Sequence, residues 1–203
     1  MTGLRRREVL KLGGASALAA MAPSWPLLPA PTGGSSPLVL ADLRYSDSLA
    51  FARGAGRHGA EIVPLARNLA DIWFGMVKPR LPYLQIMAGL TLDSDLFVLE
   101  RLAEDSGAGT LYRGAHDWRY GQSSAHRLGG ALPLARLSAS LIEGEATLWA
   151  ERLGAALVET NWMGMERTEP RQRAELRLNQ FPAADSPRYF VSWLLRWTPV
   201  ETG

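Results

Sequence analysis

Apolar and polar residues between positions 38 and 113 follow the spacing of short strands, each followed by a helix. Residues 38–43 form an apolar run with a polar end, and residues 46–59 then place apolar side chains at helical spacing. This order recurs further along the chain. The predicted strands are 38–43, 61–65, 83–89 and 109–113, and the predicted helices are 46–59, 91–106 and an apolar excursion at 69–82. Such alternation favours parallel strands joined by right-handed helical crossovers.

Several residues mark the ends of these elements. Ser46 and Thr91 stand before apolar helical patterns and are predicted N-caps, because their hydroxyls can accept from free N–H groups of the first turn. Gly59 and Gly107 follow the same helices and are predicted to end them. Pro64 lacks an N–H group, so it predicts an edge position for the strand at 61–65 or an end of that strand.

The last third of the chain has a less regular pattern. A helix is predicted at 143–158, and the aromatic and branched residues of 189–197 predict a strand buried on both faces. The polar segment 166–187 alternates arginine with glutamate and is predicted to be a solvated face. The sequence therefore predicts an α/β domain over 38–203, with a small, mainly parallel sheet flanked by helices.

Composition excludes several kinds of chemistry. The chain has 203 residues and no cysteine. Iron–sulfur clusters, c-type haem attachment, thiolate zinc sites and a cysteine nucleophile all require sulfur, so none of these is predicted. Any other cofactor stays unknown at this stage. No glycine-rich dinucleotide or phosphate-loop motif is present either.

The N-terminus has the order of an export signal: a basic head is followed by an apolar stretch rich in alanine and glycine. It resembles a twin-arginine (Tat) signal, with Val9 and Arg5 as departures from the usual phenylalanine and hydroxyl residue. The residues that match the motif are Arg6, Arg7, Leu10 and Lys11. The resemblance implies recognition by the Tat translocation machinery and passage of an already folded protein, to a periplasmic or secreted location. It also implies a co-exported partner as one reason for this route.

We interpret residues 1–30 as the signal and 31–37 as a linker. A small-x-small site ends at Ala22 and a second possible cleavage site, Leu28-Pro29-Ala30, ends at Ala30; each is followed by proline, which is unfavourable for cleavage. An uncleaved signal would leave the domain anchored to the membrane, although its apolar stretch is shorter than the ~20 residues that span a bilayer.

Charge argues against nucleic acid as a partner. The chain has 22 basic and 20 acidic side chains, of which four basic and one acidic lie in the first eleven residues, so the remainder carries a net charge of −1. Nucleic-acid binding draws most of its affinity from lysine and arginine on phosphates. We therefore predict no nucleic-acid partner.

One candidate ligand site lies where the predicted parallel strands end. Ligands of open α/β sheets bind beyond the carboxyl ends of the strands, near helix N-termini. Those positions carry Arg44, Ser46, Thr91 and Ser94, which are predicted to bind a small anion. The alternative is that the hydroxyls only cap helices and that Arg44 pairs with a neighbouring aspartate.

A second candidate is the segment 116–126, which contains two of the three histidines. His116, Asp117 and His126 are weak catalytic candidates. Nucleophilic and acid–base catalysis commonly use an imidazole beside a carboxylate and a serine hydroxyl. No Gly-x-Ser-x-Gly turn surrounds the serines, which disfavours a triad. The three groups also suit a divalent metal, but their spacing is not that of a helical metal motif, so no metal is predicted. A polar loop with hydrogen-bonded histidines stays the main alternative.

Two functions follow from these observations. The first is an exported, non-catalytic binding module or accessory subunit that crosses the membrane folded, with or without a partner. The second is a periplasmic enzyme for a small anionic substrate, with Arg44 as anchor and His116 as general acid or base.

Overall fold

The computed structural model describes residues 36–65, 68–118, 124–131, 134–142, 146–159, 171–178 and 182–197. Its strands are β1 (Leu38–Asp42), β2 (Glu61–Leu65), β3 (Ile86–Thr91), β4 (Ala108–Trp118), β5 (Ser124–Gly130), β6 (Gln172–Leu178) and β7 (Tyr189–Trp197). Its helices are α1 (Ser46–Arg57), α2 (Leu69–Ile72), α3 (Asp93–Glu104), α4 (Leu134–Ile142) and α5 (Trp149–Glu159). The predicted signal, with Arg6, Arg7, Leu10 and Lys11, lies outside the described residues.

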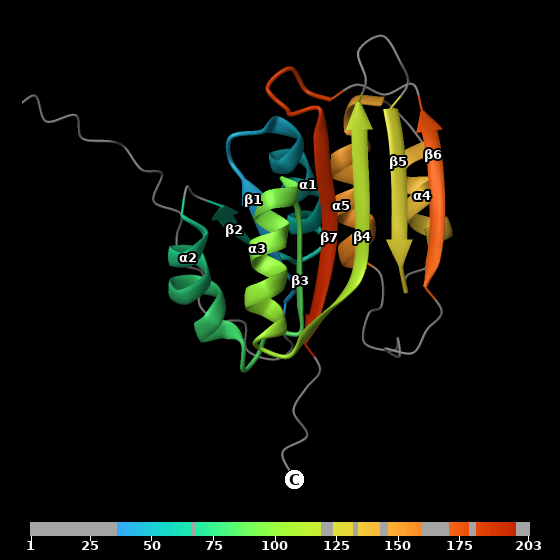
Figure 1. Cartoon of the computed structure of the whole chain (residues 1–203). Coiled ribbons are helices and arrows are strands. Elements are labelled where there is room, and N and C mark those ends of the chain that lie inside the picture. Colours follow the sequence, from blue (N-terminus) through green and yellow to red (C-terminus); the bar gives the residue numbers. More distant parts are fainter. Residues whose placement is uncertain are drawn as a thin grey trace, which may run out of the picture. The chain divides into compact units, whose positions relative to one another are not determined.

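The described strands form one seven-stranded sheet in the order β2-β1-β3-β7-β4-β5-β6 (Figure 1). Strand β1 pairs in parallel with β2 and β3, and all other pairs are antiparallel. The α/β class is confirmed, but the sheet is mixed and not mainly parallel. The reason is β7, which comes from the end of the chain and inserts between β3 and β4. Strand β2 lies at the edge, as Pro64 predicted.

The insertion of β7 still leaves β1, β2, β3 and β4 pointing the same way, because β3 and β4 are both antiparallel to β7. Their carboxyl ends therefore lie at one rim of the sheet. Strand β4, however, is longer than predicted and runs on to Trp118. Arg113 and His116 therefore lie inside this strand and not in a loop beyond it.

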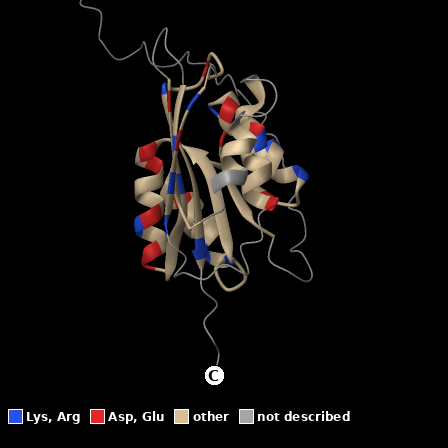
Figure 2. Cartoon of the chain, turned by 90° about the vertical axis from the view of Figure 1, so that its right-hand side faces the viewer, with Lys and Arg blue, Asp and Glu red and all other residues tan. Residues whose placement is uncertain are grey.

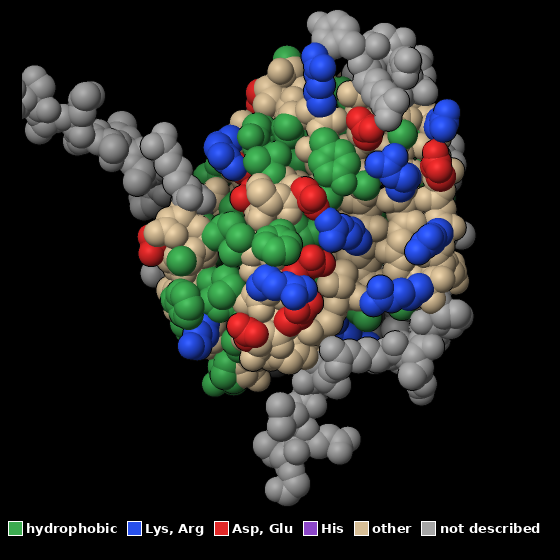
Figure 3. All heavy atoms as spheres, in the orientation of Figure 1, with side chains coloured by type: hydrophobic (Ala, Val, Ile, Leu, Met, Phe, Trp, Pro, Cys, Tyr) green, Lys and Arg blue, Asp and Glu red, His purple; other side chains and the backbone are tan. Residues whose placement is uncertain are grey.

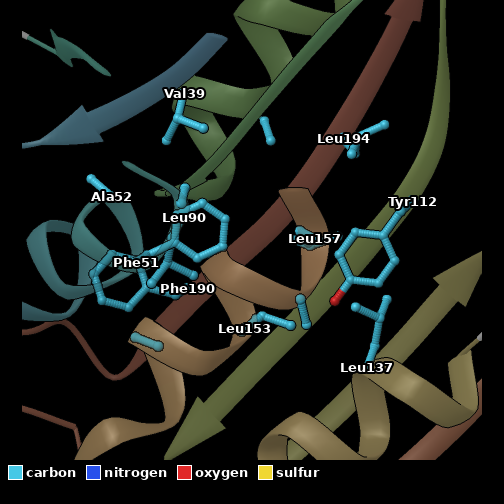
Figure 4. Close-up of a cluster of buried hydrophobic side chains, with 14 of the residues drawn as sticks. Val39, Phe51, Ala52, Leu90, Tyr112, Leu137, Leu153, Leu157, Phe190 and Leu194 are labelled. Carbon is cyan, nitrogen blue, oxygen red and sulfur yellow. The ribbon is translucent and has the colours of Figure 1, made fainter. Parts of the chain in front are cut away.

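Helices cover the sheet on both faces, as Figure 2 shows from the side of β6. Helices α1, α4 and α5 share one hydrophobic core with the sheet. Phe51 of α1, Leu153 of α5 and Phe190 of β7 lie in this core (Figure 4). Helix α3 and the π-helical turn Trp73–Val77 share a second core with Met87, Trp193 and Leu195 on the opposite face. Among the described residues, no helix is long and apolar enough to cross a bilayer.

Two glycines allow α1 and α5 to touch. A Cβ atom at Gly54 would collide with the carbonyl of Glu151, and one at Gly154 would collide with the carbonyl of Phe51. The helices therefore cross with their backbones in contact, at positions where no other residue fits without displacement.

Both predicted N-caps need correction. Helix α1 begins at Ser46 itself, with Tyr45 as N-cap, and α3 begins at Asp93, with Leu92 as N-cap. Thr91 is instead the last residue of β3, because its pairing with Val191 of β7 extends the strand to that position. Gly59 and Gly107 do follow the helix ends, with φ of 86° and 82°, values that favour glycine.

Candidate functional site

The first candidate, Arg44 at the end of β1, is held by a carboxylate of its own strand. The Arg44 backbone N–H and Nε donate to Asp42 Oδ1 at 3.0 and 2.9 Å, and Nη2 donates to Oδ2 at 2.6 Å. The Asp42 side chain is fully buried, and this hydrogen bond raises the pKa of the Arg44 guanidinium. Arg44 Nη2 also lies 3.9 Å from Asp95 Oδ2. The guanidinium is therefore already paired with an internal anion.

Ser46, which was predicted for the same anion site and lies at the start of α1, also binds an internal carboxylate. Its backbone N–H donates to both Asp185 oxygens at 3.3 and 3.2 Å, and its hydroxyl donates to Oδ2 at 2.6 Å. The hydroxyl bond lowers the pKa of Asp185. Asp185 thus occupies the helix N-terminus where a small external anion was predicted.

The remaining rim residues do not join these groups. The Thr91 hydroxyl is buried, accepts from Trp193 Nε1 at 3.0 Å and donates to the Leu92 carbonyl at 3.1 Å. Ser94 is exposed in the first turn of α3. The Thr91 hydroxyl is therefore committed to the packing of β7, and no hydrogen bond among the described residues joins it to Arg44 or Ser46.

The same rim is acidic where an anion site would be basic. Asp42 and Asp47 are both buried, and Asp95 is partly buried. Burial raises the pKa of Asp47 and of Asp95, and the charge of Asp42 adds to the rise at Asp95. Asp47 is nevertheless fixed, because its Oδ2 accepts from the Ala183 backbone N–H at 2.9 Å. This concentration of carboxylates disfavours an anionic substrate at the rim.

The two histidines of the second candidate do meet. His116 of β4 and His126 of β5 are directly opposite in the antiparallel register, and their Nδ1 atoms lie 2.7 Å apart. Both side chains are fully buried, between the sheet and Trp149 of α5. Burial lowers the pKa of His116 well below its ordinary value of 6.5, and the positive charge that His126 carries when protonated lowers it further. His116 is therefore neutral in the folded protein near pH 7.

A hydrogen-bonded chain extends from both ends of this pair. On one side, His116 Nε2 lies 2.7 Å from Ser192 Oγ, which lies 3.0 Å from the Tyr112 hydroxyl. On the other side, His126 Nε2 lies 3.1 Å from Ser124 Oγ, which donates to the Leu178 carbonyl at 2.8 Å. The chain thus joins side chains from β4, β5 and β7 to the backbone of β6.

The carbonyl at one end sets the direction of every bond in this chain. Ser124 gives its proton to Leu178, so it must accept from His126 Nε2–H. With one proton on each imidazole ring, His126 Nδ1 then accepts from His116 Nδ1–H. His116 Nε2 then accepts from Ser192, and Ser192 accepts from Tyr112. With one proton on each ring, in opposite tautomers, every donor of the chain has an acceptor. We call these five side chains the histidine chain.

Local sequence explains how β4 builds this chain. Successive residues of a strand face opposite sides, so Tyr112, Gly114 and His116 point inward together. A Cβ atom at Gly114 would collide with the hydroxyls of Tyr112 and Ser192, so glycine leaves the space in which those hydroxyls meet. Burial also raises the pKa of the Tyr112 hydroxyl, which keeps it a donor.

The same alternation removes Asp117 from the pair. Asp117 follows His116 directly and faces the other side of the sheet, so the predicted trio of His116, Asp117 and His126 is not assembled. No group of three histidine, cysteine, aspartate or glutamate side chains suited to a metal ion occurs in the described part of the chain. The Ser192–His116 contact has the atoms of a nucleophile and a base, but both are sealed in the core without a carboxylate partner. The geometry is that of a structural network.

Sequence reasoning missed Tyr112 and Ser192. Ser192 did carry a signal, since it is the only small hydroxyl residue in the apolar run 189–197, and a lone buried hydroxyl needs a hydrogen-bond partner.

The fold and the two candidate sites define an α/β protein with a mixed seven-stranded sheet, an acidic strand rim and a sealed polar network. No family model, curated protein or solved structure matches this chain.

Proposed function

We propose that this chain is an exported, non-catalytic binding module or accessory subunit, translocated in the folded state by the Tat machinery. The observation that carries the non-catalytic part is the burial of the histidine chain with its donors satisfied. A general acid or base must reach the proton that it transfers, and His116 is fully enclosed.

The state of the rim residues supports the same proposal. An enzyme for a small anion would need the Arg44 guanidinium free to bind its substrate. Arg44 instead pairs with Asp42 and lies near Asp95, on the acidic rim of the sheet. The export part rests on the resemblance of residues 6–11 to a Tat signal.

Export is tested by fractionating bacteria that produce the full chain. We expect the chain in the periplasmic fraction, or in the membrane fraction if the signal is not cleaved, and we expect Arg6→Lys/Arg7→Lys to keep it in the cytoplasm. Arg5→Lys is the matched control, because it lies next to the arginine pair and outside it. Unchanged export of the double variant would refute the Tat route.

The accessory role is tested by native extraction from the source cells, followed by size-exclusion chromatography. We expect the chain to elute together with a stoichiometric partner. A strictly monomeric chain without any partner would contradict the proposal.

A further inference from the structure

One part of the sheet is covered by none of the described helices. On the face that α3 covers, the second hydrophobic core draws on β1, β2, β3, β7 and the start of β4, and on no residue of β5 or β6. Over the rest of that face the outward side chains of β4, β5 and β6 meet solvent, and Figure 3 shows arginines spread across this area. We call this area the open face. It consists of Arg113, Ala115, Asp117, Ala125, Arg127, Gly129, Arg173, Glu175 and Arg177.

The strand register arranges these residues in three rows across β4, β5 and β6. Arg113, Gly129 and Arg173 form one row, and Ala115, Arg127 and Glu175 form the next. Asp117, Ala125 and Arg177 complete the third row. Arg127 therefore lies at the centre, diagonal to Arg173 and Arg177, at the ~7–8 Å spacing of diagonal neighbours in antiparallel strands.

Two arginines of the open face differ from most others in the described part of the chain. Arg44, Arg53, Arg57, Arg80, Arg101 and Arg113 each form an ion pair with a carboxylate. Arg127 and Arg173 are exposed and have no such pair with any described residue. Arg177 lies 3.5 Å from Glu175, at the limit of a hydrogen bond. The open face thus presents two guanidinium groups that form no ion pair with a described carboxylate, although Glu175 lies opposite Arg127 and Asp117 belongs to the same face.

We propose that the open face binds an acidic, extended segment of a partner polypeptide. This inference rests on the proposed binding function and names its surface. A guanidinium group binds a carboxylate through two parallel hydrogen bonds, a bidentate geometry. The guanidinium groups of Arg127 and Arg173 can therefore bind two acidic side chains of one segment. Ala115, Ala125 and Gly129 surround Arg127 and leave room for a main chain to approach the sheet.

Nucleic acid is the less suitable occupant of the open face. Sheets that bind single-stranded nucleic acid use exposed aromatic side chains on which the bases stack. The outward residues of β5 and β6 include no aromatic side chain. Charge attraction without a stacking surface favours carboxylates of a protein.

The test uses the full chain with fluorescein-labelled poly-L-glutamate as probe and fluorescence anisotropy as readout. All samples carry Arg5→Gln, Arg6→Gln, Arg7→Gln and Lys11→Gln, so that the basic N-terminus does not bind the probe. The test variant is Arg127→Gln/Arg173→Gln. The control is Arg53→Gln/Arg57→Gln, which removes the same charge from exposed positions of α1 on the other side of the sheet.

We expect the test variant to bind roughly five- to tenfold more weakly, the effect of two exposed ion pairs, and the control to change by less than about twofold. Thermal unfolding verifies that both are folded. Equal affinities for the two variants would overturn the proposal. Binding of a single-stranded oligonucleotide through the same arginines, as tight as that of poly-L-glutamate, would also overturn it. So would a dimer of the chain that is lost in the test variant and kept in the control.

Native extraction separates this inference from the proposed function. A partner that co-elutes equally with the unsubstituted chain and with Arg127→Gln/Arg173→Gln refutes the open face as the binding surface and leaves the binding module standing. Absence of a partner from both samples refutes the binding module itself.

Discussion

Removal of the Ser124 hydroxyl should destabilise the fold more than removal of the Tyr112 hydroxyl, although both belong to the histidine chain. Ser124→Ala leaves the buried His126 Nε2–H without its acceptor at 3.1 Å and takes the donor from the Leu178 carbonyl. A buried donor without a partner costs ~1–3 kcal/mol. In this variant the donor and acceptor of every remaining hydrogen bond in the histidine chain could be exchanged. The Tyr112 hydroxyl would then be the donor without an acceptor, so the cost would remain.

Tyr112→Phe, in contrast, removes the first donor of the histidine chain and leaves no buried donor without an acceptor. Ser192 still donates to His116 at 2.7 Å and loses only the proton that it accepted from Tyr112. The expected loss is that of one ordinary hydrogen bond, ~0.5–1.5 kcal/mol. We therefore expect Ser124→Ala to cost about twice as much as Tyr112→Phe.

Urea unfolding near pH 8, above the ordinary pKa of histidine, measures both losses as shifts of the midpoint at constant slope. Ser140→Ala is the matched control, since the Ser140 hydroxyl donates only to the Leu137 carbonyl of its own helix. Its effect should stay within about 0.5 kcal/mol. A Tyr112→Phe loss equal to or larger than that of Ser124→Ala would refute the assigned direction of the chain.

Two further predictions concern pH and packing. Because the pKa of His116 is lowered in the folded state, the unfolded chain binds more protons, so the free energy of unfolding should be highest above pH ~6.5 and fall as pH drops below it. Urea midpoints measured from about pH 8 to 5.5 check this, and a constant midpoint would contradict it. Gly54→Ala should destabilise by ~1–3 kcal/mol through its clash with α5, whereas Gly56→Ala, at an exposed position with only ordinary contacts, should stabilise by up to ~1 kcal/mol. Thermal melting distinguishes the two signs, and a stabilised Gly54→Ala would argue against the close helix crossing.

Local pattern was enough for much of the first half of the fold. The predicted strand 61–65 has the bounds of β2, and the strand at 38–43 and the helices at 46–59 and 91–106 end within two residues of β1, α1 and α3. The C-terminal strand was also predicted with its observed bounds, Tyr189–Trp197. These elements have strong apolar periodicity, and periodicity is a local property.

Strands β5 and β6 were missed, because their pattern differs from that of a buried parallel strand. In β6 charged residues alternate with Ala174, Leu176 and Leu178, which were hidden within a segment predicted as a solvated face. One side of β6 packs on the core and the other belongs to the open face, which explains both the charge and the alternation.

The sequence by itself determined the α/β class, the absence of sulfur chemistry and the resemblance of the N-terminus to an export signal, since each depends on residue type or on spacing along the chain. Tertiary structure alone decided that β7 separates β3 from β4, that Arg44 and Ser46 bind Asp42 and Asp185, and that His116 bonds to His126 and Ser192. These pairings join residues as many as 139 positions apart. Which strand lies beside which follows from the packing of the sheet against its helices, a property that no short segment carries.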